Sequence, residues 1–251
     1  MNKKLKIISW NVNGIRSIHK KGFLEWFKKE KADIVCLQEI KAQKEQIPDD
    51  LINLKNYHFY SNQAVKKGYS GVVVWTKQLP IKVDYKLGLK RFDQEGRILK
   101  LEYPDFTLIN LYLPHGGRGK ENLAYKLECY AKLLSFLKKT KNTILVGDFN
   151  IAHQEIDLAR PGNNKNNIMF TPEERKQIDN LISLGFTDTF RKFNQKPGNY
   201  TWWPYFINAR DRNLGWRIDY CFTLKGLSIK DAFILNKVKG SDHCPIGINV
   251  G

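Results

Sequence analysis

The most constraining feature of this sequence is a short apolar run that ends in polar side chains, TILVGDFN at positions 143–150. Residues 143–146 are β-branched residues or leucine, which is the composition of a short buried strand. Gly147 interrupts the run, and Asp148 and Asn150 follow two positions apart. Because residues i and i+2 of an extended backbone point to the same face, the pattern predicts a carboxylate and a carboxamide side by side at a strand end. A strand followed by an Asx turn is the purely structural alternative.

The charge balance of the chain points to a polyanionic partner. Lys and Arg number 42 and Asp and Glu 25, so the formal net charge of the 251 residues is +17. Such an excess on a globular chain indicates binding to nucleic acid or to an anionic membrane surface, with a Lys-rich solvated surface as the alternative. No segment approaches the roughly 20 apolar residues of a membrane-spanning helix. The apolar run at 5–10 is too short for a signal peptide, so we expect a first strand there and no association with a membrane.

The cysteines indicate the compartment. Cys36, Cys129, Cys221 and Cys244 lack metal-binding spacing and lie in apolar or helical contexts. Buried, reduced thiols are therefore expected, as in an intracellular protein. In a prokaryote this location would be cytoplasmic and associated with the nucleoid.

Strand-like and helix-like segments alternate along the chain. Helices are predicted at 22–31, at 121–139 and from Thr171, where a Thr N-cap, Pro172 and two acids form a helix start. We find no repeat and no linker-like break, so residues 1–251 are expected to form one α/β domain with additional antiparallel strand pairs. The order of the strands does not follow from this pattern. Strands are predicted at 5–10, 33–38, 57–62, 71–76, 97–103, 106–113, 143–146, 216–223, 227–235 and after 245.

Polar side chains recur at the ends of these apolar runs, which is how α/β folds assemble sites. Their oxygens, with no Cys or His cluster nearby, suit a hard cation such as Mg²⁺ rather than Zn²⁺. One histidine among carboxylates can orient a water for attack on phosphorus. There is no phosphate-binding loop of the NTPase type and no Ser or Cys in a nucleophile setting, so direct attack by water is favoured. The candidates are Asn11, Glu39, Tyr112, Asp148, Asn150, Asp219 and the pair Asp242-His243.

Several motifs resemble the exonuclease III family of apurinic/apyrimidinic (AP) endonucleases. They follow the family's order from residue 7 to residue 247. The Ser-Asp-His element is shared with the wider endonuclease/exonuclease/phosphatase superfamily, whereas the blocks at 152–158 and 208–220 are much more specific to the DNA-repair branch. The motifs are WNVNGIR at 10–16, LQEIK at 37–41, GYSGV at 68–72, GDFN at 147–150, AHQEIDL at 152–158, NARDRNLGWRIDY at 208–220 and GSDHCP at 240–245.

The resemblance implies a four-layered α/β sandwich, with two mixed β-sheets face to face and helices outside. It implies Mg²⁺-dependent hydrolysis of the DNA backbone 5′ to abasic sites, with 3′→5′ exonuclease and 3′-end-processing activity. Glu39 would be the principal ligand of Mg²⁺, for which Mn²⁺ can substitute. The rest of the metal and phosphate shell would be Asn11, Asp148, Asn150, Asp242 and His243.

The same resemblance assigns catalytic roles. Asp148, placed by Asn150, would orient or deprotonate the attacking water. His243, held by Asp219, would bind the phosphoryl oxygen and stabilise its developing charge. Tyr112 would contact the phosphate or assist the leaving 3′ oxygen. Whether His243 or Asp148 is the formal base is left open by the sequence.

The resemblance also assigns DNA contacts, and the expected partner is double-stranded DNA with abasic sites or blocked 3′ ends, bound by a monomer. Trp202, Trp216 and Ile218 match a small apolar pocket for a flipped abasic sugar, and a pocket too small for a base rejects intact nucleotides. Core packing is the alternative for these three residues. Further family positions are an arginine that reaches into the DNA and two asparagines that contact its backbone, matched here by Arg118, Asn164 and Asn167.

Two positions depart from the family pattern. His115 stands where the family more often has Asn or Ser, and Trp202-Trp203 is bulkier than the Phe-Trp of some relatives. Another phosphoesterase of the superfamily, acting on inositol phosphates or sphingomyelin, is the first alternative function, and the +17 charge argues against it. A non-catalytic DNA-binding module is the second, but it predicts gaps among the acid, amide and His positions, and the sequence has none.

Overall fold

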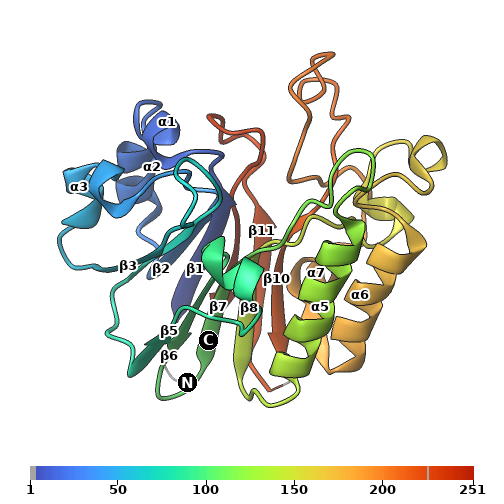
Figure 1. Cartoon of the computed structure of the whole chain (residues 1–251). Helices are drawn as coiled ribbons and strands as arrows, with labels where there is room; N and C mark the ends of the chain where they lie inside the picture. Colours follow the sequence, from blue (N-terminus) through green and yellow to red (C-terminus); the bar gives the residue numbers. More distant parts are fainter. Residues whose placement is uncertain (1–3, 225) are drawn as a thin grey trace.

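The computed structural model describes residues 4–224 and 226–251 and consists of two six-stranded sheets packed face to face. Helices cover the outer face of each sheet, which confirms the predicted four-layered α/β sandwich (Figure 1). The strand orders are β11-β12-β1-β2-β4-β3 and β5-β6-β7-β8-β10-β9. Within these sheets, β1–β2 and β7–β8 are parallel pairs and the other pairs are antiparallel, so both sheets are mixed as predicted.

The element bounds agree with most of the predicted ranges. The strands are β1 Leu5–Asn11, β2 Ile34–Gln38, β3 His58–Asn62, β4 Val72–Thr76, β5 Lys82–Asp84, β6 Ile98–Glu102, β7 Thr107–Tyr112, β8 Thr143–Asp148, β9 Phe186–Asp188, β10 Asp219–Leu224, β11 Ile229–Ile234 and β12 Ile246–Val250. The α-helices are α1 Ile15–His19, α2 Phe23–Glu30, α3 Asp49–Ile52, α4 Lys90–Gln94, α5 Leu123–Leu137, α6 Pro172–Ser183 and α7 Thr189–Phe193. Short 3₁₀ turns lie at Lys44–Gln46, Glu155–Asp157 and Pro161–Asn164.

Side-chain alternation along the central strands builds the layers. On β8, Ile144 and Val146 enter the core between the two sheets, whereas Leu145 faces the outer layer with α5 and α6. This is the period of two that an extended chain imposes. Each such side chain, removed from water, contributes on the order of 1.5–3 kcal/mol, so a strand buried on both faces is fixed in register.

The outer helices pack against the sheets through their aromatic and aliphatic side chains. Phe23 and Phe27 of α2 are buried against Trp75 of β4, with ring centroids 5.9 and 5.5 Å away, while Trp26 is half-buried on the same helix. The predicted start of α6 is confirmed. Thr171 Oγ1 accepts from the backbone N–H of Glu174, and a Glu174 carboxylate oxygen accepts from the N–H of Thr171 in return.

A buried polar contact joins the two sheets below the site. Asn110 of β7 donates to the carbonyls of Leu37 and Val73 in the other sheet at 3.1 and 2.9 Å. Gln38 completes the link by donating to Asn110 Oδ1 at 2.7 Å. Because an unpaired buried amide is costly, this contact fixes how the strand ends of one sheet lie against those of the other.

Some predicted boundaries were wrong. β10 begins at Asp219 and not at 216, because Trp216 makes only isolated bridges to Leu158 and Trp202. The short elements β5, β9, α1, α3, α4 and α7 had no counterpart in the sequence prediction. The four cysteines are buried and free, as expected. Across residues 4–224 and 226–251, no helix has the length and apolar character needed to cross a bilayer.

Candidate active site

The predicted polar strand ends meet at one edge of the sandwich, away from the chain termini (Figure 1). β7 and β8 run parallel, so Tyr112 lies beside Asp148. β10 runs antiparallel to β8, so its first residue, Asp219, pairs with Asp148, the last residue of β8. In the other sheet Asn11 ends β1 beside Gln38, and Glu39 follows. Residues far apart in sequence are thus brought together by strand register within each sheet and by the packing of the two sheets.

Gly147 does not end the strand as the sequence suggested, because β8 continues through it to Asp148. Its φ is 140°, and a Cβ at this position would lie 1.9 Å from the carbonyl oxygen of Leu111 on β7. The glycine therefore permits the close approach of β7 and β8 directly below the site.

Asp148 and Asn150 lie side by side, but through a turn and not along an extended chain. Asn150 has φ of 51°, and its backbone N–H donates to Asp148 Oδ1 at 2.8 Å. Its side-chain amide donates to Asp148 Oδ2 at 3.2 Å and to the carbonyl of Leu113 at 2.9 Å. Both sequence interpretations are therefore combined: the Asx turn is the means by which the two polar groups meet.

His243 is held between two aspartates and is 4% exposed. Its Nδ1 lies 2.8 Å from Asp219 Oδ2, which confirms the predicted pair, and its Nε2 lies 4.0 Å from Asp148 Oδ2. Burial alone would lower the pKa of His243. The charge of Asp219 and its hydrogen bond, with smaller effects of Asp242 and Asp148, instead raise that pKa to about 10. The imidazole is thus cationic at neutral pH and directs Nε2 toward Asp148.

The surroundings of Asp148 favour its neutral form, whereas those of His243 favour its charged form. Burial, followed by the charge of Asp219, raises the pKa of Asp148 to about 7, against the opposing effects of His243 and hydrogen bonds from Asn11 and Asn150. A carboxylate whose pKa lies near neutrality is suited to accept a proton from water.

Asn11 connects the acids of the two sheets. Its amide donates to Glu39 Oε2 at 3.1 Å and to Asp148 Oδ2 at 2.9 Å. The other oxygen of Glu39 lies 2.8 Å from Lys41 Nζ. The carboxylate oxygens of Glu39 and Asp148 suit a hard divalent cation, and the Asn11 amide nitrogen, which contacts both, holds them in place.

A second cluster of possible metal ligands shares Asp148 with the group around Glu39. Asp148, Asp219 and His243 offer ligand atoms within 4.8 Å of one another, a spacing compatible with a metal ion. Asp219 is already committed to orienting His243, however. The set around Glu39 and Asp148 therefore remains the predicted cation site.

Asp242, which precedes His243 in the chain, is the next acidic residue of the site. Asn13 donates to Asp242 Oδ1 at 3.0 Å and the indole of Trp202 donates to Oδ2 at 3.1 Å. Burial alone raises the pKa of Asp242, but the charge of His243 and these hydrogen bonds lower it below its usual value. The carboxylate is therefore ionised and fixed in orientation.

Tyr112 is held by a buried arginine that the sequence analysis did not identify. The Arg97 guanidinium lies 4.6 Å from the centroid of the Tyr112 ring and donates to its carbonyl at 3.0 Å. Burial, followed by the charge of Glu39, raises the pKa of Tyr112 well above its usual value, although Arg97 opposes this. The phenol keeps its proton and can donate a hydrogen bond.

A cleft opens beside these groups. It is lined by the predicted DNA-contacting residues Arg118, Asn164, Asn167, Trp202 and Trp216, and also by Asn13, His115, Lys120, Ile168, Met169, Pro204, Tyr205, Phe206 and Asp242. Ile218, which is 1% exposed, is not part of this lining and lies in the apolar cluster against which both tryptophans pack.

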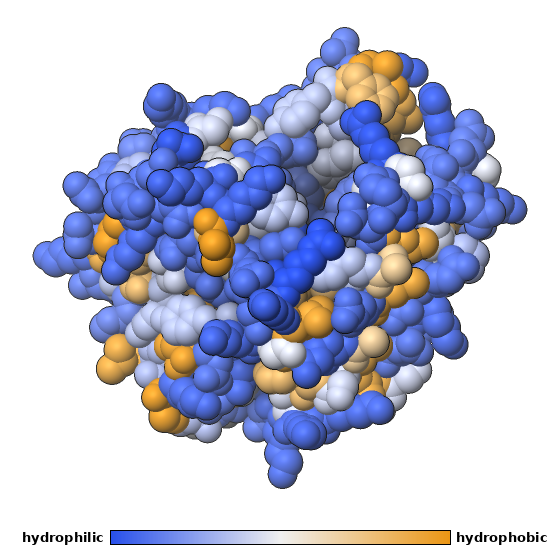
Figure 2. Space-filling view, in the orientation of Figure 1, coloured by the Kyte–Doolittle hydropathy of each residue, from blue (hydrophilic) through white to orange (hydrophobic). Residues whose placement is uncertain are grey.

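Sequence reasoning missed the exposed apolar rim of the cleft. Tyr205, Phe206 and Ile207 are 75, 60 and 54% exposed, and they follow the Trp202-Trp203 pair in a protruding loop. Figure 2 shows an apolar patch over this loop on an otherwise largely hydrophilic face. A run of apolar residues in a predicted loop was the available signal, since isolated chains seldom expose such a patch without a partner.

His115, one of the two departures, lines the cleft as a neutral donor. The Gly117 N–H donates to His115 Nδ1 at 3.2 Å, so the proton of the neutral ring lies on Nε2. Burial, followed by the charge of Lys126, lowers the pKa of His115. The ring therefore offers one N–H donor, whereas the side-chain amide of an asparagine would offer two.

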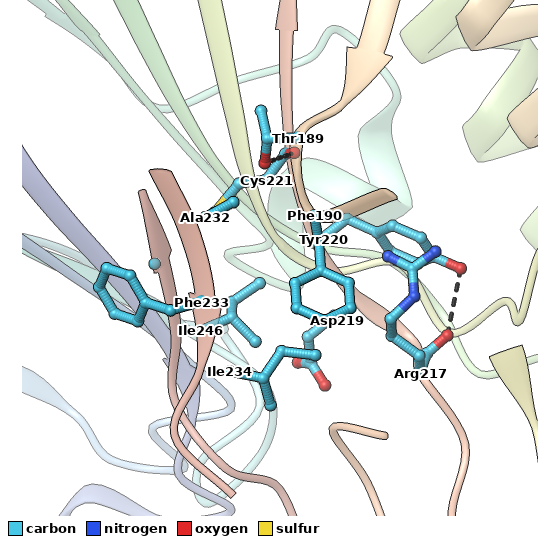
Figure 3. A pocket seen from close by; sticks show the side chains of 11 residues that line it. Thr189, Phe190, Arg217, Asp219, Tyr220, Cys221, Ala232, Phe233, Ile234 and Ile246 are labelled. Atoms are coloured by element: carbon cyan, nitrogen blue, oxygen red, sulfur yellow. Dashed lines mark hydrogen bonds between the residues drawn. The ribbon is translucent and has the colours of Figure 1, made fainter. Parts of the chain in front are cut away.

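A network of buried charges fixes the segment before Asp219. Arg217 donates to Asp157 at 2.8 Å and to Asp188 at 2.6 Å. In Figure 3 its guanidinium lies over the Tyr220 ring, 4.4 Å from the ring centroid, and the Tyr220 hydroxyl bonds to the Arg217 carbonyl. Arg217 thus faces away from the apolar cluster that holds Trp216 and Ile218, as the predicted alternation requires.

Comparisons with known proteins agree with this geometry. The chain matches the model of the Endonuclease/Exonuclease/phosphatase family over residues 8–243. It is 45% identical over 249 residues to an exodeoxyribonuclease of Bacillus subtilis, with 96% of this chain and 98% of that protein covered. It is 42% identical over 250 residues to the DNA repair nuclease APEX1 of Danio rerio, with 96% of this chain and 81% of that protein covered.

Solved structures extend the likeness to the whole fold. An AP endonuclease from Archaeoglobus fulgidus has a TM-score of 0.89 at 31% identity, with 97% of this chain and 98% of that chain covered. A 3′ phosphatase from Neisseria, bound to a product DNA hairpin, has a TM-score of 0.90 at 26% identity, with 98% and 99% covered.

Proposed function

Because this chain belongs to the Endonuclease/Exonuclease/phosphatase family, we propose that it hydrolyses DNA on the 5′ side of abasic sites and processes blocked 3′ ends, with Mg²⁺ as its cofactor. The broader conclusion is that the protein is a DNA-repair nuclease, a hydrolase of phosphodiester bonds, and it follows from the family match and the named relatives. The narrower proposal is supported by one observation above all: a cleft with cationic, amide and indole side chains is lined by Trp202, whose ring centroid lies 6.5 Å from that of His243.

The proposed reaction is a direct attack of water on phosphorus. Asp148, with its pKa of about 7, accepts the proton of the attacking water, and Asn150 holds the Asp148 carboxylate in place. His243, cationic through Asp219, donates from Nε2 to the phosphoryl oxygen that gains negative charge. Tyr112 donates to the phosphate or to the leaving 3′ oxygen. The geometry favours Asp148 as base, because His243 already carries its proton.

The metal site proposed for this reaction consists of Glu39 and Asp148, bridged by Asn11, with Asn150, Asp242 and His243 around the phosphate. A bound Mg²⁺ or Mn²⁺ would neutralise charge on the phosphoryl group as a Lewis acid. Lys41 Nζ lies 2.8 Å from a Glu39 carboxylate oxygen, so it is the cation already paired with this side of the proposed site.

Substrate choice is assigned to the cleft. Trp202 and Trp216 would enclose an extruded sugar that lacks its base, and extrusion costs least where a base is already missing. Arg118, Asn164 and Asn167 would bind the backbone around it. The formal charge of +17 would hold the other phosphates without reading sequence.

Three further proposals concern the molecule as a whole. Residues 1–251 form one catalytic domain, and that domain acts as a monomer, because the proposed site draws all of its residues from one chain. It works inside the cell, which is consistent with four buried free thiols.

One labelled duplex tests the proposed function. It carries a central abasic analogue and a recessed 3′ end, so incision and end-shortening are read in the same lane over time. We expect Mg²⁺-dependent incision 5′ to the abasic position, and none in EDTA. A phosphoinositide is assayed in parallel, and release of phosphate from it without DNA incision would assign the protein to another branch of the superfamily.

A further inference from the structure

The backbone just after the β8 strand end is held from behind by three buried side chains. The carbonyl of Phe149 accepts from the Tyr130 hydroxyl at 2.5 Å, that of Asn150 from Lys126 Nζ at 2.6 Å, and that of Ile151 from the Tyr220 hydroxyl at 2.8 Å. Consecutive carbonyls outside regular structure are thus all satisfied by side chains, as buried backbone groups require. Asn150, at the centre, is the residue with φ of 51° whose side chain holds Asp148.

Lys126 differs from the two tyrosines because it is an amine with no access to solvent, and burial lowers its pKa against the opposing charge and hydrogen bond of Glu174. Its exposure is 0%, although it lies on α5 in a helix whose neighbouring positions are partly solvated. Besides the Asn150 carbonyl, Nζ contacts the carbonyl of His115 at 3.1 Å and Glu174 Oε1 at 2.5 Å. An ammonium group has three donors in a tetrahedral arrangement, and here each of them has one acceptor.

Glu174 connects Lys126 to the backbone of a second segment, which contains Met169 and Thr171. Its Oε1 also accepts from the backbone N–H of Met169 at 3.0 Å, and its Oε2 accepts from the N–H of Thr171 at 3.0 Å. Met169 and His115 both line the cleft. The pair therefore joins the segment that carries Asn150 to two segments of the cleft wall.

The space around Lys126 is formed to receive it. Gly116, with φ of 98°, leaves room for the lysine stem, since a Cβ there would lie 3.3 Å from Lys126 Cδ and 2.7 Å from Ile168 Cδ1. Burying an ammonium and a carboxylate costs several kcal/mol per ion before their attraction is counted. A buried ion pair is therefore weak evidence of a stabilising role, and the position of this pair behind the Asn150 turn points instead to an orienting role.

We propose that Lys126, together with Glu174, is a positioning residue for the hydrolytic step: it sets the Asn150 turn, and through Asn150 the Asp148 carboxylate, relative to the cleft. The inference rests on the proposed function, because Asn150 and Asp148 are assigned there to water activation. Lys126 itself touches neither the substrate nor the reacting atoms. Its effect is expected in kcat, because DNA affinity is set mainly by surface Lys and Arg side chains that the pair does not contact.

The test compares variants that remove the charges without leaving one ion unpaired. The double variant Lys126→Met/Glu174→Gln keeps similar volume and part of the capping of Met169 and Thr171. We expect it to fold, with kcat on the abasic duplex reduced about 10–100-fold, the range seen when partners that orient active-site groups are lost. KM should change less than about threefold. The control is Tyr103→Phe, which removes an equally buried hydrogen bond to Thr76 far from the site.

A second variant covers the case in which the double variant does not fold. Lys126→Arg keeps the charge pair, but a planar guanidinium cannot direct its donors to the same three acceptors. The same fall in kcat with KM retained is expected. Wild-type kcat in either folded variant overturns the proposal, as does a loss of activity that merely follows the melting temperature, as in Tyr103→Phe. If the wild-type protein itself does not cut the duplex, the proposed function fails, and that outcome is distinct.

Discussion

Replacing Asp219 by Asn removes the carboxylate that makes His243 a cation while keeping the shape of the side chain. In the folded protein His243 Nδ1 lies 2.8 Å from Asp219 Oδ2, and both residues are buried. An asparagine can still accept or donate at this distance, so the fold should persist. What changes is the charge next to the imidazole.

The size of the effect follows from the pKa of His243. It is about 10 with Asp219 present, against an ordinary value of 6.5, and burial by itself lowers it. In the variant we expect this pKa to fall, because the largest effect that raises it is gone, while burial still lowers it and only Asp242 and Asp148 still raise it. Each pH unit of the fall corresponds to about 1.4 kcal/mol of interaction between the charged ring and its surroundings. Where the pKa falls below the assay pH the ring is mostly neutral, and the rate should fall about 10²–10³-fold, as when one donor to a developing oxyanion is lost.

The pH dependence gives the sharper readout. Activity needs ionised Asp148, with a pKa of about 7, and protonated His243, with a pKa of about 10, so the wild-type profile is a bell between these limits. Asp219 raises both values, so its removal lowers both, and the bell should move to lower pH. The stability of the fold also depends on the pKa of His243. A raised histidine pKa stabilises the fold fully below pH 6.5, and this contribution is lost as pH rises toward 10.

Two measurements decide the matter. The His243 ring protons are titrated by NMR in EDTA, and single-turnover rates are recorded against pH at one fixed Mg²⁺ concentration. Asp179→Asn is the matched control, because Asp179 pairs with His153 at 2.8 Å outside the site and should leave both readouts unchanged. The reasoning is refuted if His243 still titrates near 10 without Asp219, or if the rate maximum stays where it was.

Other expected outcomes concern the metal, the cleft and the DNA backbone. Glu39→Ala should abolish Mg²⁺-supported cleavage while binding of non-cleavable duplex stays nearly intact, and near wild-type cleavage at low Mg²⁺ would contradict this. Trp216→Phe should fold, cut abasic duplex more slowly and cut intact nucleotides relatively more often. A lower melting temperature with unchanged abasic preference would instead place Trp216 in the core. Affinity for non-cleavable duplex should fall linearly on a log–log plot against salt, and a flat titration would remove phosphate contacts from the account.

The apolar runs were enough to predict most of the strands, and the polar residues at their ends were enough to predict side chains that the fold brings together, as Asp148, Asp219 and Asn11 show. The four layers and the position of the site at one edge were implied by the family resemblance. Strand order could not be predicted, because pairing partners such as β1 and β12 are separated by almost the whole chain. Three-residue strands such as β5 and β9 carry too few positions for a period to be visible.

The burial of charged residues was the main feature that could not be predicted from the sequence. Lys126 and Arg217 look like ordinary surface positions in their segments, yet both are 0% exposed. Their partners lie 48 and 60 residues away, at Glu174 and Asp157. A charge is buried only where tertiary structure supplies a counter-charge, so no local pattern reveals it.

Residues just after three strand ends share a left-handed backbone conformation. Strand alternation alone predicted neighbouring polar side chains there, but it did not predict the turns that bring them together. Asn13, Glu39 and Asn150, each within two positions of a strand end, have φ of 48, 57 and 51°. A residue other than glycine in this conformation costs roughly 1–2 kcal/mol, so its surroundings must hold it. For Glu39 the carbonyl accepts from the Gly14 N–H at 2.8 Å, and for Asn150 it accepts from Lys126. The left-handed turn returns each of these side chains toward the site, beside residues such as Asn11 and Asp148 that lie on the strands themselves. Local strain and the buried donors that sustain it therefore act together, and under the proposed function the position of the Asp148 carboxylate depends on residues behind this edge as well as on those that line the cleft.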